Sequence, residues 1–263
     1  MGKRFWIIGI LLLFLGLGVL LYPSVSGAVN RISGSYVIAE HQQQMEGMEQ
    51  EQLDEELARA LAYNRQLLEQ GEGEDYTRIL DLGSGIMGYI RIPDIDVNLP
   101  IYHGVEDAVL SKGVGHLPES GFPVGGEGNH AVLTGHTGLP SAKLFTDIIL
   151  LEEGDRFYIH VLDQVLCYQV DRIRVVLPTE TQDLVPVAGK DYCTLITCTP
   201  YGVNSHRLLV RGERITESLY EPPAQPQGGK NGNLWVLWLL PLPALLLLGL
   251  VLGKKFSHIR ARN

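Results

Sequence analysis

Two long apolar runs lie near opposite ends of the chain. Phe5 to Tyr22 and Leu234 to Leu252 contain no charged residue, and each is long enough for a helix to cross ~30 Å of hydrocarbon. A core helix of this length usually carries a polar face, which both runs lack. The pattern therefore predicts transmembrane helices at residues 5–22 and 234–252.

Basic residues flank both runs on the side of the chain ends. Lys3 and Arg4 precede the first run, and four Lys or Arg follow the second. Positive flanks stay in the cytoplasm, so we expect residues 1–4 and the basic tail 253–263 to be cytoplasmic and residues 23–233 to be extracellular. A cleaved signal peptide is an alternative interpretation of the first run, but the run is longer than a usual h-region, which favours an uncleaved anchor.

The predicted extracellular segment is strongly acidic. Of the 21 Lys and Arg in the chain, six lie in the two tails, so 15 basic residues face all 30 Asp and Glu and the net charge is near −15. Such a surface repels nucleic acid, which excludes nucleic-acid partners. It also repels anionic lipid, so the predicted spans must hold the protein at the membrane.

A helical part and a β-rich part follow one another in this segment. Residues 40–70 are rich in Glu, Gln, Leu and Ala without Pro, and predict a helix with one leucine-rich packed side. From about residue 84, short Val-, Ile-, Tyr- and Leu-rich runs alternate with Gly and Pro, which predicts a closed or nearly closed all-β domain. Ser141 is expected to cap a short helix, and residues 217–233, rich in Pro and Gly, to form a linker. Examples of the expected strands are Met87–Ile92, Ala131–Thr134, Arg156–Leu162, Gln164–Val176, Tyr192–Thr197 and Arg207–Arg211. The leucines expected to pack are Leu53, Leu57, Leu61, Leu67 and Leu68.

Three cysteines are present, and an odd count outside the cell leaves at least one thiol free. Cys193 and Cys198 are five residues apart, so on a regular strand they point to opposite faces and no disulfide joins them. Cys193 shares its face with Leu195, and Cys167 lies within a predicted strand. Both are therefore interpreted as packing residues, which leaves Cys198 as the candidate nucleophile.

A predicted hairpin brings a cation close to Cys198. Pro200 and Gly202 force a loop after this thiol, and the next strand starts at Arg207. The guanidinium would favour a thiolate or bind a developing oxyanion. The alternative is a buried structural cysteine with a surface arginine, which is the usual reading of a lone cysteine.

His136 follows another predicted strand. Gly135 and Gly138 flank it and leave the imidazole open to a ligand, although a loop histidine without a role is the alternative. The other histidines of the domain show no metal-binding spacing, so no zinc site is predicted. These are His103, His116, His130, His160 and His206.

Several separated motifs resemble the sortase family. They are Leu133-Thr-Gly-His136, Thr197-Cys-Thr-Pro-Tyr201 and His206-Arg-Leu-Leu-Val-Arg-Gly212. Other segments are similar to class C, the pilus-building branch of Gram-positive bacteria, and the resemblance spans about residues 84–212. These segments are Gly88-Tyr-Ile, Pro100-Ile-Tyr-His-Gly104, Gly113-Val-Gly-His116 and Gly138-Leu-Pro-Ser-Ala-Lys-Leu-Phe-Thr-Asp147.

The resemblance implies an all-β fold, an eight-stranded sortase β-barrel with short helices. This barrel would occupy residues 84–216, after an acidic helical and lid-like segment at residues 23–83, with a transmembrane helix on either side. It implies a membrane-bound enzyme with both termini cytoplasmic and no metal or organic cofactor. The enzyme class would be a cysteine transpeptidase, a hydrolase of the thiol-protease type.

The same resemblance implies a role for each candidate site residue. Cys198 would attack the Thr carbonyl of a Leu-Pro-x-Thr-Gly-like (LPxTG-like) signal, His136 would protonate the departing Gly amine, and Arg207 would hold the signal or steady the oxyanion. The thioester would then react with a lysine amine of another pilin. The partners would be pilins or surface proteins that carry such signals.

The chain departs from class C at the lid, which typically carries an Asp-Pro-aromatic motif. Glu74-Asp-Tyr76 occupies the corresponding place. It is either a degenerate plug, with Asp75 paired to Arg207 and Tyr76 over Cys198, or a plain connector. The missing Pro favours the connector.

Two other functions compete with pilin polymerisation. The first is a wall-anchoring sortase that uses a peptidoglycan-precursor amine. The second is a sorted surface protein that is itself a sortase substrate, since Leu117-Pro-Glu-Ser-Gly121 resembles a sorting signal. That segment lies in mid-domain, whereas a sorting signal directly precedes the C-terminal hydrophobic run.

Overall fold

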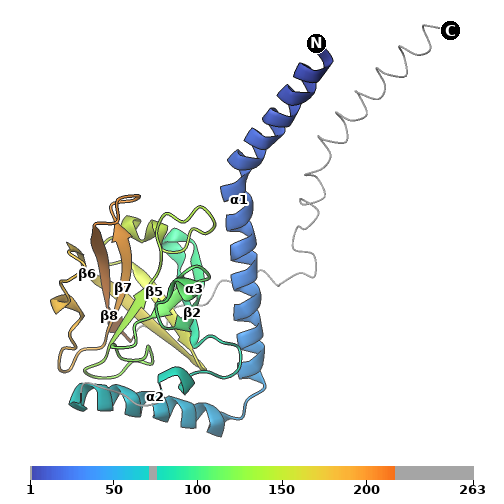
Figure 1. The fold of residues 1–263 in the computed structure, drawn as a ribbon. Coiled ribbons are helices and arrows are strands. Elements are labelled where there is room, and N and C mark those ends of the chain that lie inside the picture. Colours follow the sequence, from blue (N-terminus) through green and yellow to red (C-terminus); the bar gives the residue numbers. More distant parts are fainter. Residues whose placement is uncertain (1, 71–75, 217–263) are drawn as a thin grey trace. The chain divides into compact units, whose positions relative to one another are not determined.

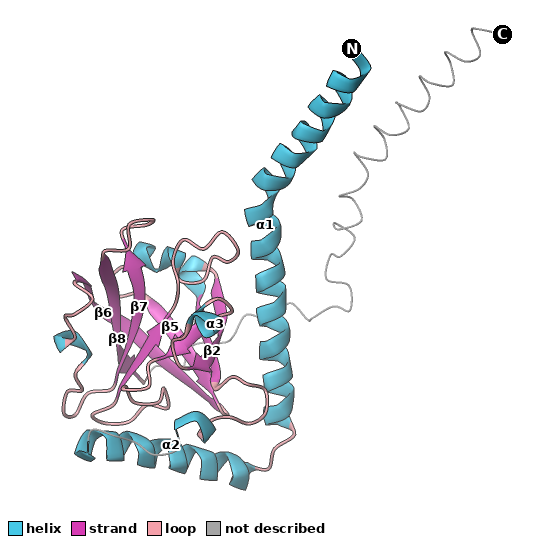
Figure 2. Ribbon diagram, viewed as in Figure 1, coloured by secondary structure: helices cyan, strands magenta, loops and turns pink. Residues whose placement is uncertain are grey.

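Eight strands close into a barrel in the computed structural model, which describes residues 2–70 and 76–216 (Figures 1 and 2). The strand order is β1-β2-β3-β4-β7-β8-β6-β5, and the pairs β2–β3 and β4–β7 are parallel. The predicted all-β barrel is thus confirmed. The strands are β1 (Gly88–Ile92), β2 (Val97–His103), β3 (Val114–His116), β4 (His130–Thr134), β5 (Arg156–Val161), β6 (Gln164–Val176), β7 (Tyr192–Thr199) and β8 (His206–Ile215).

All six strands named from the residue pattern are present, and β2 and β3 complete the eight. β2 carries Pro100 in its middle, and β3 is only three residues long. A run of three residues is too short to show alternation, so β3 owes its pairing to β2 and β4 on either side.

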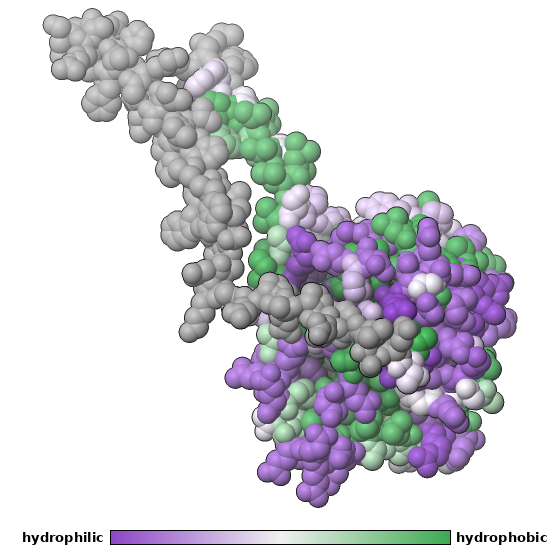
Figure 3. All heavy atoms as spheres, turned by 180° about the vertical axis from the view of Figure 1, so that it is seen from behind, coloured by the Kyte–Doolittle hydropathy of each residue, from purple (hydrophilic) through white to green (hydrophobic). Residues whose placement is uncertain are grey.

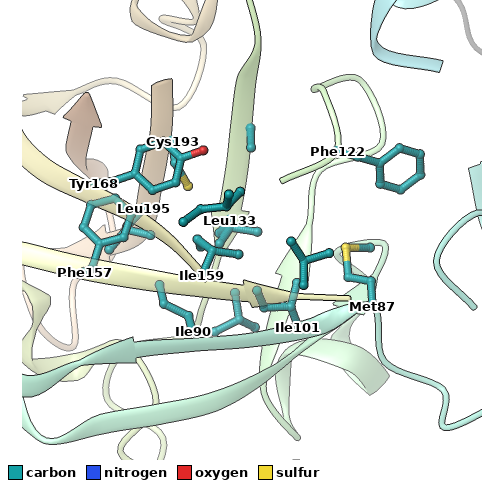
Figure 4. Close-up of a cluster of buried hydrophobic side chains, with 14 of the residues drawn as sticks. Met87, Ile90, Ile101, Phe122, Leu133, Phe157, Ile159, Tyr168, Cys193 and Leu195 are labelled. Carbon is teal, nitrogen blue, oxygen red and sulfur yellow. The ribbon is translucent and has the colours of Figure 1, made fainter. Parts of the chain in front are cut away.

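The barrel interior is filled by large apolar side chains (Figure 4). Phe157 and Tyr168 stack with ring centroids 5.5 Å apart, and both are completely buried. Gly212 of β8 lets them approach, because a Cβ there would lie 2.6 Å from the Phe157 ring. Cys193 and Leu195 of β7 face this core and are also fully buried.

The N-terminal region forms two helices, α1 (Gly2–Glu46) and α2 (Gln50–Gln70). The single helix predicted for residues 40–70 is therefore wrong. It is broken by a turn in which Gly47 N–H donates to the Gln44 carbonyl at 3.1 Å. The apolar run at the start of α1 is long and apolar enough to cross a membrane, and hydrophobic side chains line the helix in Figure 3. The predicted linker, second span and basic tail, residues 217–263, lie outside the described residues.

The second half of α1 runs along the barrel wall. Ser26 Oγ donates to the Pro140 carbonyl at 3.1 Å, close to the end of β4. Further along the helix, Gln42 Nε2 donates to the Tyr89 hydroxyl at 2.7 Å, at the start of β1. These two contacts set the direction of α1 along the barrel.

α2 covers one end of the barrel through the leucine-rich side that the sequence predicts. Leu53 is buried, and Leu57, Leu61 and Leu67 pack against the same core. The expectation for Leu68 is wrong, because it is 48% exposed. Polar contacts add to the docking: Asn64 exchanges two hydrogen bonds with the backbone of Phe122, at 2.6 and 3.1 Å.

The connections contain short helices, but the one expected after Ser141 is misplaced. Leu144 has a positive φ of 39°, which interrupts a right-handed helix. A 3-10 helix, η3 (Thr146–Leu150), begins just beyond it without a side-chain cap. The other short helices are η1 (Tyr76–Arg78), η2 (Pro93–Ile95), α3 (Asp107–Leu110) and η4 (Gln182–Leu184).

Candidate active site

Cys198 and Arg207 face each other across the β7–β8 hairpin. They are direct partners in its antiparallel ladder, so their side chains stand on the same face of the sheet. Cys198 is partly exposed. Arg207 Nη1 donates to the carbonyls of Asn204 and His206, at 3.3 and 3.1 Å, which directs one edge of the guanidinium at the loop. The prediction that Cys198 and Arg207 are neighbours across the hairpin is confirmed.

The parallel pairing of β4 with β7 brings His136 to the same place. Thr134 is the register partner of Ile196, and the two chains stay joined beyond the strand. Gly135 N–H donates to the Ile196 carbonyl at 3.0 Å, and Thr197 Oγ1 donates to the Gly135 carbonyl at 2.7 Å. Continuing this register two residues beyond Thr134 and Ile196 brings His136 level with Cys198.

The three candidate residues share the outer face of the barrel. Side chains alternate along a strand, and Leu195 and Thr197 point inward, so Ile196 and Cys198 point outward. The side chains next to the site on this face form a second, smaller apolar cluster. It consists of Val132, Val176, Ile196 and Leu209, with Leu117 and Leu184 packed against it. Apolar surface therefore borders the thiol.

The other two cysteines are buried, as predicted. Figure 4 shows Cys193 among the core side chains beside Tyr168. Burial raises the pKa of the Cys193 thiol well above its ordinary value, which keeps it protonated and unreactive. Cys167 is 6% exposed and, like Cys193, forms no disulfide among the described residues. Cys198 is thus the accessible thiol of the part of the chain that the structure describes.

His136 differs from the buried histidines in its accessibility. Its side chain is 30% exposed, whereas His116 and His130 are almost completely buried. Burial lowers the pKa of His116 to about 4, so this imidazole is neutral at physiological pH and is part of the packed interior. The imidazole of His136 is instead accessible to a ligand.

One residue near the site was missed from the sequence. Asp107, the first residue of α3, places Oδ1 3.9 Å from His136 Nε2, and its side chain is fully exposed. The carboxylate faces the imidazole from the loop after β2. No local motif links positions so far apart in the chain, so only the closed barrel shows this contact.

The proposed plug does not cover the thiol with its aromatic ring. The hydroxyl of Tyr76 lies 3.0 Å from His116 Nδ1 and 2.9 Å from the His116 carbonyl oxygen. The loop after His116 is joined to the start of β4, where Gly121 N–H donates to the His130 carbonyl, whereas Cys198 lies beyond the end of β4. Residues 74–75 lie outside the described residues. Tyr76 therefore supports the connector interpretation.

The described part of the chain offers no set of metal ligands. Within residues 2–70 and 76–216, no group of three or more His, Cys, Asp or Glu side chains is arranged to hold an ion. The chemistry open to the site is nucleophilic: an accessible thiol, an imidazole able to move a proton, and a guanidinium able to bind an oxyanion.

Known proteins are similar to this chain in sequence and in fold. A family model described as the sortase domain matches residues 90–215. A sortase C of Streptococcus pneumoniae is 42% identical with a TM-score of 0.65, over 69% of this chain and 97% of that one. A sortase C of Clostridium perfringens is also 42% identical, with a TM-score of 0.63, over 70% of this chain and all of that one. Sortase A of Streptococcus agalactiae is 32% identical over 131 residues, 49% of this chain and 52% of the relative.

The chain belongs to the sortase family, and the two structural neighbours are sortases of class C. Membership of this family supports a cysteine transpeptidase activity. The chain spans about half the length of the curated relative that it matches.

Proposed function

We propose that this protein cleaves an LPxTG-like sorting signal between Thr and Gly and joins the Thr carboxyl to a lysine amine of a pilin. The observation that carries the proposal is the register across three adjacent strands, which aligns His136, Cys198 and Arg207 on one accessible face. Two of the similar solved structures support the substrate class. The Streptococcus pneumoniae structure is described in terms of pilin substrate specificity, and the Clostridium perfringens structure with the C-terminal cell wall sorting motif.

The first half of the reaction forms a thioester. The Cys198 thiolate attacks the Thr carbonyl carbon, and the carbonyl oxygen becomes an oxyanion next to the Arg207 guanidinium. The carbon–nitrogen bond to Gly then breaks as His136 gives its proton to the departing amine. A positioned proton donor accelerates such a step by roughly 10²–10⁴-fold, and an oxyanion donor by roughly 10²–10³-fold.

The second half transfers the acyl group to an amine. His136, now neutral, takes a proton from the lysine amine as its nitrogen attacks the thioester carbonyl. The carbon–sulfur bond breaks, and Cys198 leaves as a thiolate. The apolar cluster beside the thiol suits the Leu and Pro side chains of the signal.

Thioester trapping with an LPxTG-like peptide tests this function. We expect wild type, Cys193→Ala and Cys167→Ala to form the adduct and Cys198→Ala to form none. His136→Ala and Arg207→Ala should lose several orders of magnitude of turnover while staying folded. Arg207→Lys should fail as well, because a point charge does not reproduce the planar guanidinium fork. An adduct on Cys193 would contradict the assignment.

The acceptor is tested in the second half-reaction. A trapped thioester should transfer to a pilin-type lysine peptide faster than to an amino-glycine peptide of equal charge. The opposite preference would assign wall anchoring with a peptidoglycan-type amine in place of pilin polymerisation.

We also propose that the barrel lies outside the cell with both termini in the cytoplasm. The support is the basic flank at Lys3 and Arg4 and the apolar start of α1. Protease applied to intact cells should remove the barrel and leave short protected tails. Removal of a tag placed after Asn263 would contradict the second span.

A further inference from the structure

The end of the barrel that carries Cys198 has a rim of exposed apolar side chains. Tyr201 and Val203, in the β7–β8 loop, are each 69% exposed. Ile149 and Leu150, at the end of η3, are 62% and 64% exposed. We call these four residues the apolar rim. Exposed large side chains grouped at one end of a domain indicate a surface that contacts something.

Both parts of the rim lie in the connections that follow the strands carrying the site. The β7–β8 loop begins just after Cys198. The segment that leads to η3 begins at His136, whose carbonyl accepts the N–H of Phe145 at 3.1 Å. Tyr201 also packs on the segment that leads to η3, because a Cβ added at Gly138 would lie 3.0 Å from the tyrosine ring.

The same loop joins the rim to α1. Two residues after Gly138, the Pro140 carbonyl accepts the hydrogen bond from Ser26. Ser26 is one helical turn from Tyr22, the last residue of the apolar run, which is a distance of ~6 Å along the axis. A membrane crossed by that run therefore begins about one turn beyond the loops of the site.

The direction of α1 agrees with this placement. Its later residue Gln42, about 24 Å along the helix axis from Ser26, reaches Tyr89 of β1, so α1 runs along the barrel away from the loop that Ser26 contacts. The apolar run consequently extends from the end where β4 and β7 finish. Pro23 lies at the junction, and a proline kink tilts a helix without reversing it.

We propose that the apolar rim rests on the surface of the bilayer that α1 crosses, so that the site around Cys198 lies at the level of the lipid headgroups. Tyrosine and aliphatic side chains of this kind partition into the membrane interface. The inference rests on the proposed function in one respect, because it takes α1 as a membrane span. Its consequence is that a sorting signal still attached to its own membrane segment reaches the thiol without leaving the surface.

Depth-dependent quenching tests the contact directly. The full chain with Cys198→Ala is reconstituted in phosphatidylcholine vesicles, and Val203→Cys carries an environment-sensitive fluorophore. Val165→Cys is the matched control. Val165 is a 47% exposed valine at the start of β6. It lies next to the β5–β6 turn, where Asp163 accepts a hydrogen bond from Gln50 of α2. We expect a blue shift and strong quenching by headgroup-region spin-labelled lipid at position 203, and neither at position 165.

Two results would overturn the proposal. One is water-like emission at position 203 with the same weak quenching as at position 165. The other is a signal at position 203 that follows protein density and ignores spin-labelled lipid, which would assign the rim to a second copy of the chain.

An activity measurement separates this inference from the proposed function. The double variant Ile149→Ser with Val203→Ser should cleave a soluble signal peptide at the wild-type rate. It should process a substrate held in the same vesicles by its own hydrophobic segment several-fold more slowly. If both substrates are slowed equally, or if neither is slowed, the proposed contact between the rim and the membrane is contradicted. Failure of wild type on the soluble peptide contradicts the proposed function, and the quenching experiment still decides the membrane contact.

Discussion

Replacing Gly135 with alanine should impair the site through a single methyl group. Gly135 precedes His136 and is held to β7 on both sides, by its N–H to Ile196 and by its carbonyl to Thr197. A Cβ at this position would lie 2.6 Å from Cγ and 2.7 Å from Cδ2 of the buried Phe145 ring. Carbon atoms pack at roughly 3.5–4.0 Å, so either the ring or the His136 segment must move by about 1 Å.

That displacement sets the expected magnitudes. Overpacking of this kind costs roughly 1–3 kcal/mol of stability. A misplacement of about 1 Å in a catalytic group costs on the order of 10²-fold in rate. We therefore expect kcat/KM for signal-peptide cleavage to fall by up to about 10²-fold per folded molecule, while Cys198 stays open to a small alkylating reagent.

Gly212→Ala is the matched control. A Cβ there would lie 2.6 Å from the Phe157 ring, so the crowding is equal, but Gly212 pairs with Cys193 inside the barrel and away from the site. The control should lose stability and keep its activity per folded molecule, with the folded fraction taken from near-UV circular dichroism. Wild-type activity per folded molecule in Gly135→Ala would refute the reasoning, as would equal losses in both variants.

Three further predictions concern stability and charge. Burial holds the pKa of His116 at about 4 against 6.5 in the unfolded chain, so acidification protonates the unfolded state first. Between those pH values this shift by itself should lower the free energy of unfolding by up to about 3 kcal/mol, and denaturant titrations should show a shallower fall in His116→Gln; equal slopes would count against this. Glu56→Ala leaves the buried N–H of Leu80 without the acceptor that Glu56 Oε1 provides at 2.5 Å, and should cost roughly 1–3 kcal/mol. Hydrogen exchange at Leu80 should be faster than in Glu56→Gln, and identical exchange would argue against the contact. Asp107→Asn should lower turnover only a few-fold at low salt and not at all at high salt, because the carboxylate that faces His136 is fully exposed; a large loss at high salt would show a direct role.

Patterns in consecutive residues determined much of the secondary structure of this protein. The apolar run that starts α1 and the alternation along β6 and β7 are visible in consecutive residues, so the span candidate and the six strands follow from them. The approach of Cys198 to Arg207 also follows, because a hairpin connects positions that are close in the chain. Alternation alone separated Cys193, which packs inside, from Cys198, which faces out.

Composition and residue spacing predicted the structure less well where a single residue changes the course of a segment. Glu-, Gln- and Leu-rich composition predicts one helix over residues 40–70, but the turn at Gly47 redirects the chain so that α2 can cover the end of the barrel. Leu68 follows the leucine spacing and is nevertheless exposed, because α2 has reached the edge of the surface that it covers. Propensity describes a segment by itself and contains no information about where its partner surface ends.

Only the tertiary structure decided which distant positions meet. His136 reaches Cys198 through the parallel pairing of β4 with β7, and Asp107, which follows β2, reaches His136 through the pairing of β2 with β3 and of β3 with β4. The hydroxyl of Tyr76 is bound to His116 of β3, and its ring stacks on the buried rings of His116 and Phe122. Such pairings join residues tens of positions apart. Their loop-closure entropy is offset by burial of the whole core, so no local run of residues encodes them.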